Sequence, residues 1–399
     1  MGEHPHPVGL EYTIVIYDCN GDLLFLAAGG ASVITHDGVR RTRPPRCDDA
    51  DMHAMTVVPG QKGTAGVGEV ADPDAQDAAL LVRGMTLGVC GTDREIAEGA
   101  YGTPPSGEER LIIGHESLGE VLEAPAGSGF APGDLVVGIV RRPDPVPCPA
   151  CAADEWDMCR TDSFAERGIV RLHGYGSERW RVEPDFAVPI PSGLGELGVL
   201  LEPASVLAKA WDQVDRISQR AFFLRGRALV TGAGPIGLMA CLLGVQRGYE
   251  MHVVDLALAG PKRDLVEDLG ARYHSGDAAD IGVDVDVVIE CTGLGAVGRS
   301  AARRLASGGI MCLTGIINLD PAPDVDATTL NRNMVLRNQV LFGTVNAGRR
   351  HWEQAAQALA TADPSWLRGL ITRRVPLTSW TEALDRHPED IKVVVDLTA

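Results

Sequence analysis

The chain has 399 residues, more than one hydrophobic core usually supports, so we expect two domains. Its formal net charge of -18 opposes binding to nucleic acid and to anionic membranes, and we expect neither as a partner. The sequence has neither an apolar run of about 18 residues nor a basic and then apolar leader, which predicts a cytoplasmic protein. The nine cysteines are odd in number, which indicates free thiols or metal ligands rather than a disulfide framework.

The first 51 residues differ from the rest of the chain. Residues 11–18 and 22–27 are typical of strands, and Asn20-Gly21 between them favours a tight hairpin turn because both residues accept a positive φ. The charged run that follows, rich in arginine and proline, is typical of a linker. Two interpretations stay open for this N-terminal extension: an appended hairpin, or a misassigned start codon upstream of Met52 or Met55.

Short strands broken by glycine and proline come next. We expect them over residues 55–58, 79–83, 119–123 and 132–137. Cys90 and His115 fall on loops between these strands, where functional side chains are commonly held by a stiffer scaffold. We therefore assign an irregular β-rich domain to residues 52–203.

Strands and helices alternate after residue 204. The expected strands are 228–231, 252–254, 285–289, 310–313 and 339–343, and the expected helices are 204–214, 236–247 and 262–269. This alternation implies an α/β domain with a doubly wound parallel sheet, which we assign to residues 204–346. Residues 347–399 contain an expected helix over 352–360 and a final apolar strand over 392–396, which should return to the β-rich domain.

A thiol, an imidazole and two carboxylates in separated segments form the ligand set expected of a catalytic zinc. They are Cys90, His115, Glu116 and Glu202. A catalytic zinc has three protein ligands and one position open to water or substrate. Taken singly, each residue is more simply explained as a buried thiol, a core histidine or a surface charge. Their combination favours the metal.

A second cluster of cysteines lies in the proline-rich segment 143–159. Its three thiols, Cys148, Cys151 and Cys159, are spaced like the ligands of a structural zinc, but such a site needs four ligands. Either a carboxylate completes the site, or the loop holds free thiols. The candidate carboxylates are Asp144, Asp154, Glu155 and Asp157.

A glycine-rich turn joins the expected strand 228–231 to the next helix. It consists of Gly232, Ala233, Gly234, Pro235, Ile236 and Gly237. In this setting the glycines allow a tight turn, and the helix N-terminus faces the pyrophosphate of a dinucleotide. Asp255, about twenty residues further on, suits the ribose hydroxyls and would repel a 2′-phosphate, which favours NAD over NADP. Lys262 and Arg263 would soften that preference.

Together these features resemble the zinc-dependent medium-chain alcohol dehydrogenase superfamily, and within it the glucose dehydrogenase branch known from archaea. The resemblance covers residues 55–399 and implies a GroES-like β-rich catalytic domain, a Rossmann domain and assembly as a homodimer or homotetramer. The matching segments are 89–93, 113–116, 140–143, 166–169, 173–175, 201–203, 345–346, His351 and 390–392.

The resemblance also implies roles for individual residues. Cys90, His115 and Glu202 would bind zinc, and Glu116 would enter or leave its coordination sphere. Thr92 would relay the substrate proton, and Asp93 would orient His115. Sugar hydroxyls would contact Glu166 and Asn346, and less surely His351. Substrate contacts are also implied for Thr92, Glu116 and Glu202, and a cofactor contact for Asn346.

Two positions depart from the family pattern. Ser205-Val206 stands where a polar or acidic residue often follows Glu-Pro, and Pro145 stands where the superfamily has the first cysteine of its structural zinc site. Both departures bear on which substrate is used and on how many metals are bound, more than on the type of reaction.

The implied reaction is oxidation of the C1 hydroxyl of an aldose to an aldonolactone, with hydride transfer to NAD(P). A polyol, threonine or simple alcohol dehydrogenase with the same zinc and cofactor is the alternative. A non-catalytic dinucleotide-binding protein or a zinc-free reductase relative is opposed by the intact set of Cys90, His115 and Glu202.

Overall fold

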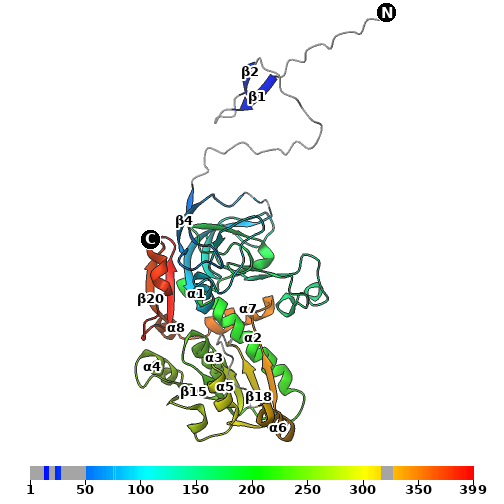
Figure 1. The fold of residues 1–399 in the computed structure, drawn as a ribbon, viewed down its shortest axis with the longest axis vertical. Coiled ribbons are helices and arrows are strands. Elements are labelled where there is room, and N and C mark those ends of the chain that lie inside the picture. The colour runs from blue at the N-terminus through cyan, green and yellow to red at the C-terminus, as the bar shows by residue number, and fades with distance from the viewer. Residues whose placement is uncertain (1–12, 18–22, 28–50, 75, 77, 316–326) are drawn as a thin grey trace, which may run out of the picture. The chain divides into compact units, whose positions relative to one another are not determined.

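The structure, a computed structural model, describes residues 13–17, 23–27, 51–74, 76, 78–315 and 327–399 (Figure 1). Internal contacts divide the chain into two units, Met1–Asp51 and Met52–Ala399. In the first unit, β1 (Thr13–Tyr17) and β2 (Leu23–Ala27) pair antiparallel, with Thr13 opposite Ala27. The two predicted strands are therefore confirmed, whereas the predicted turn at Asn20-Gly21 lies outside the described residues.

Two sheets form most of the β-rich part of the second unit. The smaller has the order β4-β3-β6, and the larger has the order β13-β8-β7-β5-β21-β20 with β12 paired to β5. Pairing in both is antiparallel except between β20 and β21. The bounds are β3 (Met52–Val57), β4 (Gly66–Val70), β5 (Leu80–Val89), β6 (Leu111–Ile112), β7 (Glu116–Glu123), β8 (Leu135–Gly138), β12 (Arg179–Val182), β13 (Ala187–Pro189), β20 (Ile371–Pro376) and β21 (Lys392–Asp396).

Strand β5 is about twice as long as the sequence suggested, because two glycines looked like breaks. A Cβ at Gly84 would collide with the carbonyl oxygen of Ser177, and one at Gly88 would collide with the carboxylate of Glu116. These glycines mark close approaches of neighbouring segments within a continuous strand. The extended strand ends at Val89, directly before Cys90.

The sequence analysis missed several short elements, because a run of only a few residues shows no clear hydrophobic periodicity. Strands β9 (Arg141–Arg142), β10 (Ala165–Arg167) and β11 (Arg171–Leu172) form a small sheet beside the cysteine loop. The remaining short elements are α1 (Gly91–Ala97) and the 3-10 turns η1 (Cys151–Ala153), η2 (Trp156–Met158), η3 (Pro184–Phe186), η4 (Gly195–Leu200), η5 (Ala278–Asp280) and η6 (Leu377–Leu384).

The α/β part contains six parallel strands in the order β16-β15-β14-β17-β18-β19. Numbered within the sheet, this is 3-2-1-4-5-6, which confirms the predicted doubly wound fold. The strands are β14 (Arg227–Thr231), β15 (Glu250–Asp255), β16 (Arg272–Ser275), β17 (Val285–Glu290), β18 (Leu305–Leu313) and β19 (Val340–Gly343). The helices are α3 (Pro235–Gln246), α4 (Pro261–Asp268), α5 (Gly295–Ala302) and α6 (Ala327–Arg337).

Helix α2 (Leu201–Ser218) lies where the β-rich and α/β parts meet, and packs against α3 and α7 (Arg349–Ala360) (Figure 1). It begins three residues earlier than expected, because a proline in the first turn needs no hydrogen-bonded N–H. Its first turn therefore contains Glu202. Helix α8 (Pro364–Leu370) leads into β20.

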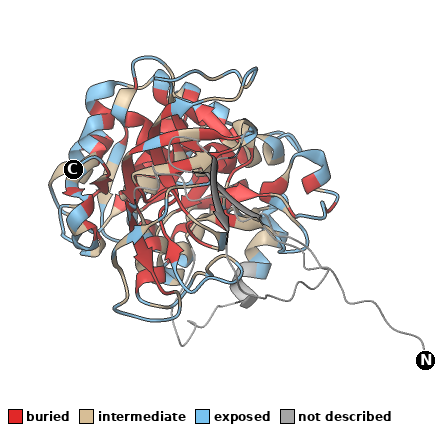
Figure 2. Cartoon of the chain, turned by 90° about the horizontal axis from the view of Figure 1, so that it is seen from above, coloured by how far each residue is buried: buried red, intermediate tan, exposed pale blue. Residues whose placement is uncertain are grey.

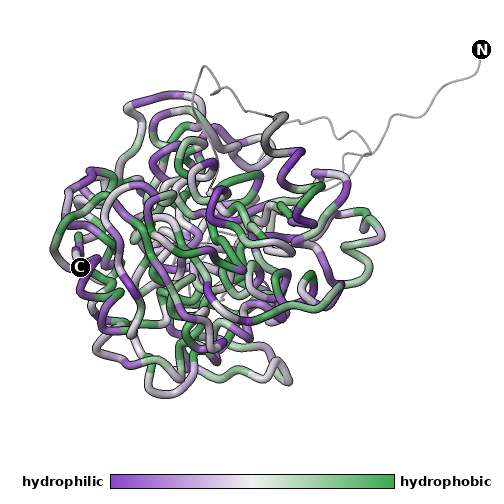
Figure 3. Tube along the Cα trace, turned by 90° about the horizontal axis from the view of Figure 1, so that it is seen from below, coloured by the Kyte–Doolittle hydropathy of each residue, from purple (hydrophilic) through white to green (hydrophobic). Residues whose placement is uncertain are grey.

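The last strand returns to the β-rich sheet, as its apolar run predicted. Strand β21 pairs antiparallel with β5, with Val394 opposite Gly88. Buried residues concentrate inside the unit (Figure 2). Apolar and polar stretches alternate along the chain (Figure 3). Within the described part of the chain, no helix combines the length and apolar character that a membrane crossing requires.

Candidate active site

A helix cap fixes the position of Cys90. The thiol of Cys90 accepts a hydrogen bond from the backbone N–H of Thr92 at 3.2 Å, and the N–H of Cys90 donates to Asp93 Oδ2 at 2.9 Å. This reciprocal cap begins α1. Cys90 and Thr92 are half-buried and Asp93 is fully buried, so the thiol is held by a rigid local structure.

Close backbone packing positions His115. Gly114 has φ +96°, and a side chain there would collide with Leu87. Residues 168 and 174 are also glycines, because a Cβ at either position would come against the backbone of Gly114. The imidazole that follows has Nε2 3.1 Å from Cys90 Sγ and Nδ1 3.5 Å from Asp93 Oδ1.

Two carboxylates complete this catalytic cluster, which comprises Cys90, His115, Glu116 and Glu202. Potential ligand atoms of His115, Glu116 and Glu202 lie within 4.8 Å of one another, and so do those of Cys90, Asp93 and His115. Glu116 begins β7 and Glu202 lies in the first turn of α2. The two groups share His115, so the structure places the other three proposed zinc ligands, Cys90, Glu116 and Glu202, around this imidazole.

Lys392 is a member of this environment that sequence reasoning missed. Its ammonium pairs with Glu116 Oε2 and donates to the carbonyl oxygen of Val89 at 3.2 Å. The side chain is 1% exposed. The sequence feature that could have indicated this role is a single lysine beside the apolar run 393–395, because a lysine in a buried strand requires an anionic partner.

Charges in the catalytic cluster influence one another. Burial lowers the pKa of His115, but the charges of Cys90 and Asp93 outweigh it, and the net pKa lies well above the usual value. Desolvation raises the pKa of Glu202 to about 7, a shift that Glu116 reinforces and His115 opposes. Burial likewise lowers the pKa of Lys392, but Glu116 reverses this and raises it overall.

Two of the residues proposed to contact the substrate, Glu166 and Asn346, are hydrogen-bonded to each other. Asn346 Nδ2 donates to Glu166 Oε1 at 2.8 Å, and the same oxygen accepts from Arg141 Nε and Nη2 at 3.0 and 2.9 Å. Glu166 is buried and Asn346 is half-buried. Strand β10, which carries Glu166, leads into Gly168, which packs against Gly114 beside the catalytic cluster. Arg141 was in a matching segment, but its role was not predicted.

His351 and Ser205 have structural contacts. His351 is fully buried, its Nδ1 accepts from the N–H of Gly348 at 3.1 Å, and its Nε2 lies 3.4 Å from Asp212 Oδ2. The imidazole thus stabilises the start of α7. Ser205 is buried and its hydroxyl donates to the carbonyl oxygen of Glu202 at 2.7 Å, so it braces the turn that carries the carboxylate.

The glycine-rich turn joins β14 to α3 at the carboxyl edge of the parallel sheet. Gly232 has φ +85°, and a Cβ at Gly237 would collide with the carbonyl oxygen of Gly232. Asp255 ends β15, where its two carboxylate oxygens accept from the N–H groups of Ala233 at 2.6 Å and Ala257 at 3.1 Å. The turn and the carboxylate therefore lie side by side.

The three cysteines of the second cluster meet as well, with their sulfur atoms within 4.8 Å of one another. Of the candidate fourth ligands, Asp144 is buried and its Oδ2 lies 4.0 Å from Cys159 Sγ. Glu155 instead pairs with Arg350 at 2.8 Å, and Asp157 pairs with Lys209 at 2.9 Å. Asp154 is exposed and has φ 59°.

Comparison with known proteins gives matches along the whole second unit. The family model of the glucose dehydrogenase C-terminus matches residues 195–397, and that of the alcohol dehydrogenase GroES-like domain matches residues 76–192. A glucose 1-dehydrogenase from Methanocella arvoryzae is 36% identical over 359 residues, which cover 87% of this chain and 100% of that protein. One from Thermoproteus tenax is 36% identical over 87% of this chain and 99% of its own length.

A solved structure provides a similar match in three dimensions. Haloferax mediterranei glucose dehydrogenase, in complex with NADP, Zn and gluconolactone, superimposes with a TM-score of 0.80. The two chains are 32% identical, and the match covers 86% of this chain and 99% of that one.

Proposed function

Because the chain belongs to the glucose dehydrogenase family of the zinc-dependent medium-chain dehydrogenases, we propose that it oxidises the C1 hydroxyl of a glucose-like aldose to an aldonolactone, with hydride transfer to NAD or NADP. The observation that carries this proposal is the catalytic cluster, whose thiol, imidazole and carboxylates converge from separate segments. Oxidation at C1 is supported by the family match.

The donors of the catalytic cluster fit a zinc ion. A thiolate, an imidazole nitrogen and a carboxylate oxygen are ordinary ligands of catalytic zinc. We assign Cys90, His115 and Glu202 as the ligands, and Glu116 is able to enter or leave the coordination sphere. Zinc bound there would supply a Lewis acid that lowers the pKa of a hydroxyl group. Asp93, 3.5 Å from His115 Nδ1, holds the orientation of the imidazole.

The remaining residues bind and orient the sugar and move its proton. Thr92, half-buried beside the thiol of Cys90, is assigned the relay that passes the hydroxyl proton outward. Glu166 and Asn346 orient the sugar ring through its hydroxyl groups, which matters because hydride transfer requires two aligned carbons. Glu116 and Glu202 contact the substrate at the catalytic cluster.

The glycine-rich turn would hold a nicotinamide dinucleotide, which accepts the hydride. We assign its binding domain to residues 204–346, and the catalytic domain to residues 52–203 with the return segment 347–399. Asp255 favours NAD, since its charge opposes a 2′-phosphate beside the ribose. Lys262 and Arg263 on α4 act in the other direction, and the Haloferax enzyme is in complex with NADP.

The second cluster of cysteines is proposed to hold a structural zinc, with Asp144 as the fourth ligand. The support is its buried carboxylate near Cys159 and the engagement of Glu155 and Asp157 by cations. Metal analysis of the Asp144→Asn variant tests this assignment. We expect one zinc per chain where the unaltered protein has two, and two in both proteins would contradict it.

Substrate-dependent reduction of NAD and of NADP tests the reaction. Glucose, galactose, sorbitol, threonine and ethanol are supplied in turn to the purified enzyme. We expect turnover with an aldose and a higher kcat/KM with NAD. No turnover of any aldose would contradict the proposed function, and turnover of sorbitol, threonine or ethanol alone would identify the alternative dehydrogenase class.

The roles of the two glutamates can be separated by metal analysis. In Glu202→Ala we expect loss of the catalytic zinc, and in Glu116→Ala we expect it to be retained. The opposite result would contradict the ligand assignment.

A further inference from the structure

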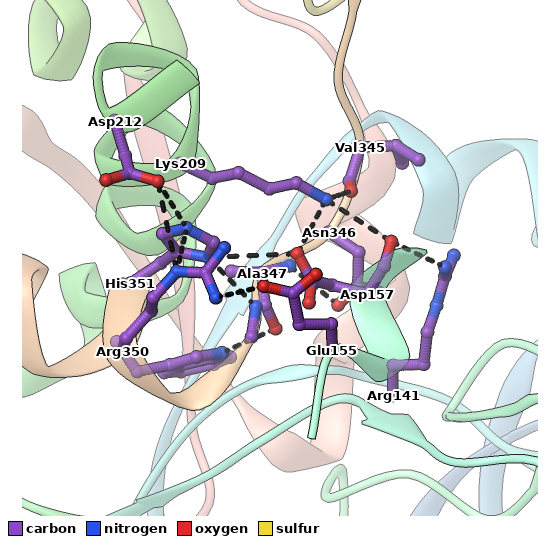
Figure 4. Close-up of polar contacts among 12 residues, drawn as sticks. Arg141, Glu155, Asp157, Lys209, Asp212, Val345, Asn346, Ala347, Arg350 and His351 are labelled. Atoms are coloured by element: carbon purple, nitrogen blue, oxygen red, sulfur yellow. Dashed lines mark hydrogen bonds and ion pairs between the residues drawn. The ribbon is translucent and has the colours of Figure 1, made fainter. Parts of the chain in front are cut away.

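A buried ion pair connects α2 with the cysteine loop. Lys209 Nζ lies 2.9 Å from Asp157 Oδ2, and the two side chains are 3% and 1% exposed (Figure 4). Burying two charges costs free energy that their attraction only partly offsets, so such a pair is weak evidence for a role in stability alone. Its other contacts indicate what it does.

Lys209 holds the peptide that leads into Asn346. Its ammonium donates to the carbonyl oxygen of Val345 at 3.0 Å (Figure 4). Asn346 has φ 60°, a left-handed conformation that residues other than glycine rarely adopt. In this conformation its Oδ1 accepts from the N–H of Ala347 and its Nδ2 donates to Glu166. The hydrogen bond from Lys209 thus helps to fix the orientation of the peptide group between Val345 and Asn346.

Asp157 connects the same ion pair to the partner of Asn346. Its carbonyl oxygen accepts from Lys209 Nζ at 3.3 Å and from Arg141 Nη1 at 3.4 Å. Arg141 in turn donates twice to Glu166. The fit around the carboxylate is tight, because a Cβ at Gly348 would lie 2.6 Å from Asp157 Oδ1.

We propose that Lys209 and Asp157 are positioning residues that set sugar affinity by holding Asn346 and Glu166 together. This inference rests on the proposed function, in which both of those side chains bind the sugar. Lys209 and Asp157 are buried and act through their neighbours. Since they act on residues that bind and orient the sugar, their loss should raise the KM for sugar by a larger factor than it lowers kcat.

The central variant replaces both charges, Lys209→Met with Asp157→Asn, so that neither is left buried and unpaired. We expect the KM for the aldose to rise about tenfold, as for loss of one charge-assisted hydrogen bond. The inhibition constant of the aldonolactone should rise with it, while kcat and the KM for the cofactor change by a smaller factor.

A control removes a more exposed ion pair elsewhere in the chain, with side chains 25% and 61% exposed. Arg304 pairs with Asp284 at 2.6 Å and donates to the carbonyl oxygen of Val283 at 2.9 Å. Arg304→Met with Asp284→Asn should leave the KM for sugar unchanged. A rise equal to that of the central variant would show a general effect of lost ion pairs and overturn the inference.

Coupling to Asn346 distinguishes positioning from general support. If the ion pair acts through Asn346, its removal should add nothing to the rise in sugar KM of Asn346→Ala. Effects that multiply, or an Asn346→Ala enzyme with unchanged sugar KM, would overturn the inference. So would an equal change in kcat or cofactor KM. If the unaltered enzyme oxidises no aldose, the proposed function itself has failed.

Asp157→Asn alone provides a test that does not depend on folding of the double variant. It is isosteric and leaves Lys209 able to donate to Val345, so we expect a smaller rise in sugar KM than for the double variant. Where the double variant does not fold, the single one is combined with Asn346→Ala, and multiplying effects again overturn the inference.

Discussion

The catalytic cluster and the cysteine loop offer similar donor atoms in different surroundings. The catalytic cluster gathers its donors from the end of β5, the start of β7 and the first turn of α2. The loop draws Asp144, Cys148, Cys151 and Cys159 from one short segment. The catalytic cluster also has charged neighbours, Asp93 and Lys392, which pair with its members. A metal in the catalytic cluster is thus subject to the packing of several elements, whereas one in the loop depends on local structure.

Removing the imidazole of the catalytic cluster should have the largest effect. In His115→Ala we expect loss of the catalytic zinc and a fall in kcat/KM beyond the roughly 100-fold caused by changes to outer partners of a metal site. A change in the loop, Asp144→Asn, should lower kcat/KM far less. Metal analysis and steady-state kinetics measure both, and equal losses of activity would erase the functional distinction between the two clusters.

The charged neighbours of the catalytic cluster should matter for stability. Lys392→Met leaves Glu116 buried without its cation, and we expect a loss of about 3–5 kcal/mol in the free energy of unfolding. Adding Glu116→Gln should recover much of that loss. Denaturant unfolding of the two variants measures it, and a single variant as stable as the unaltered protein would show that the ion pair is dispensable.

The effect of Asp93 on zinc affinity should distinguish the catalytic cluster from the cysteine loop. Asp93→Asn removes the charge beside His115, and we expect the affinity of the catalytic zinc to fall about 10–100-fold. Competition with a chelator measures this change. A metal in the cysteine loop would have no contact with Asp93 and would serve as an internal control, and an equal loss there would point to general damage.

Lowering the pH should weaken zinc binding by the cysteine loop in the range between the pKa values of two of its thiols. Backbone N–H groups lower the pKa of Cys148 to about 7, whereas desolvation raises that of Cys151 to about 11. Between these values zinc must displace the proton of Cys151, so affinity should increase up to about tenfold per pH unit. Zinc titrations of metal-depleted protein between pH 7 and 9 measure the slope. A flat profile would mean that Cys151 is no ligand.

The parts that sequence predicted have local signatures. The glycine-rich turn, the alternating strands and helices, and the three loop cysteines each lie within a short window. The catalytic donors could be proposed because their combination matches the ligand set of a catalytic zinc, although no single one of them indicates it. Lys392 and Arg141 could not be assigned, because their roles exist only through partners far along the chain. The same holds for the length of β5, where Gly84 and Gly88 serve neighbouring segments.

Strand β21 has a consequence for how the protein is made. It pairs with β5 and brings Lys392 to Glu116 and to the carbonyl oxygen of Val89. During synthesis, the ribosome releases the catalytic donors well before this strand emerges. Until then Glu116 lacks the ammonium of Lys392, and β5 pairs with β7 on one side but has not yet gained β21 along the stretch Thr86–Val89. The catalytic cluster therefore reaches its final form only after the entire parallel sheet has left the ribosome.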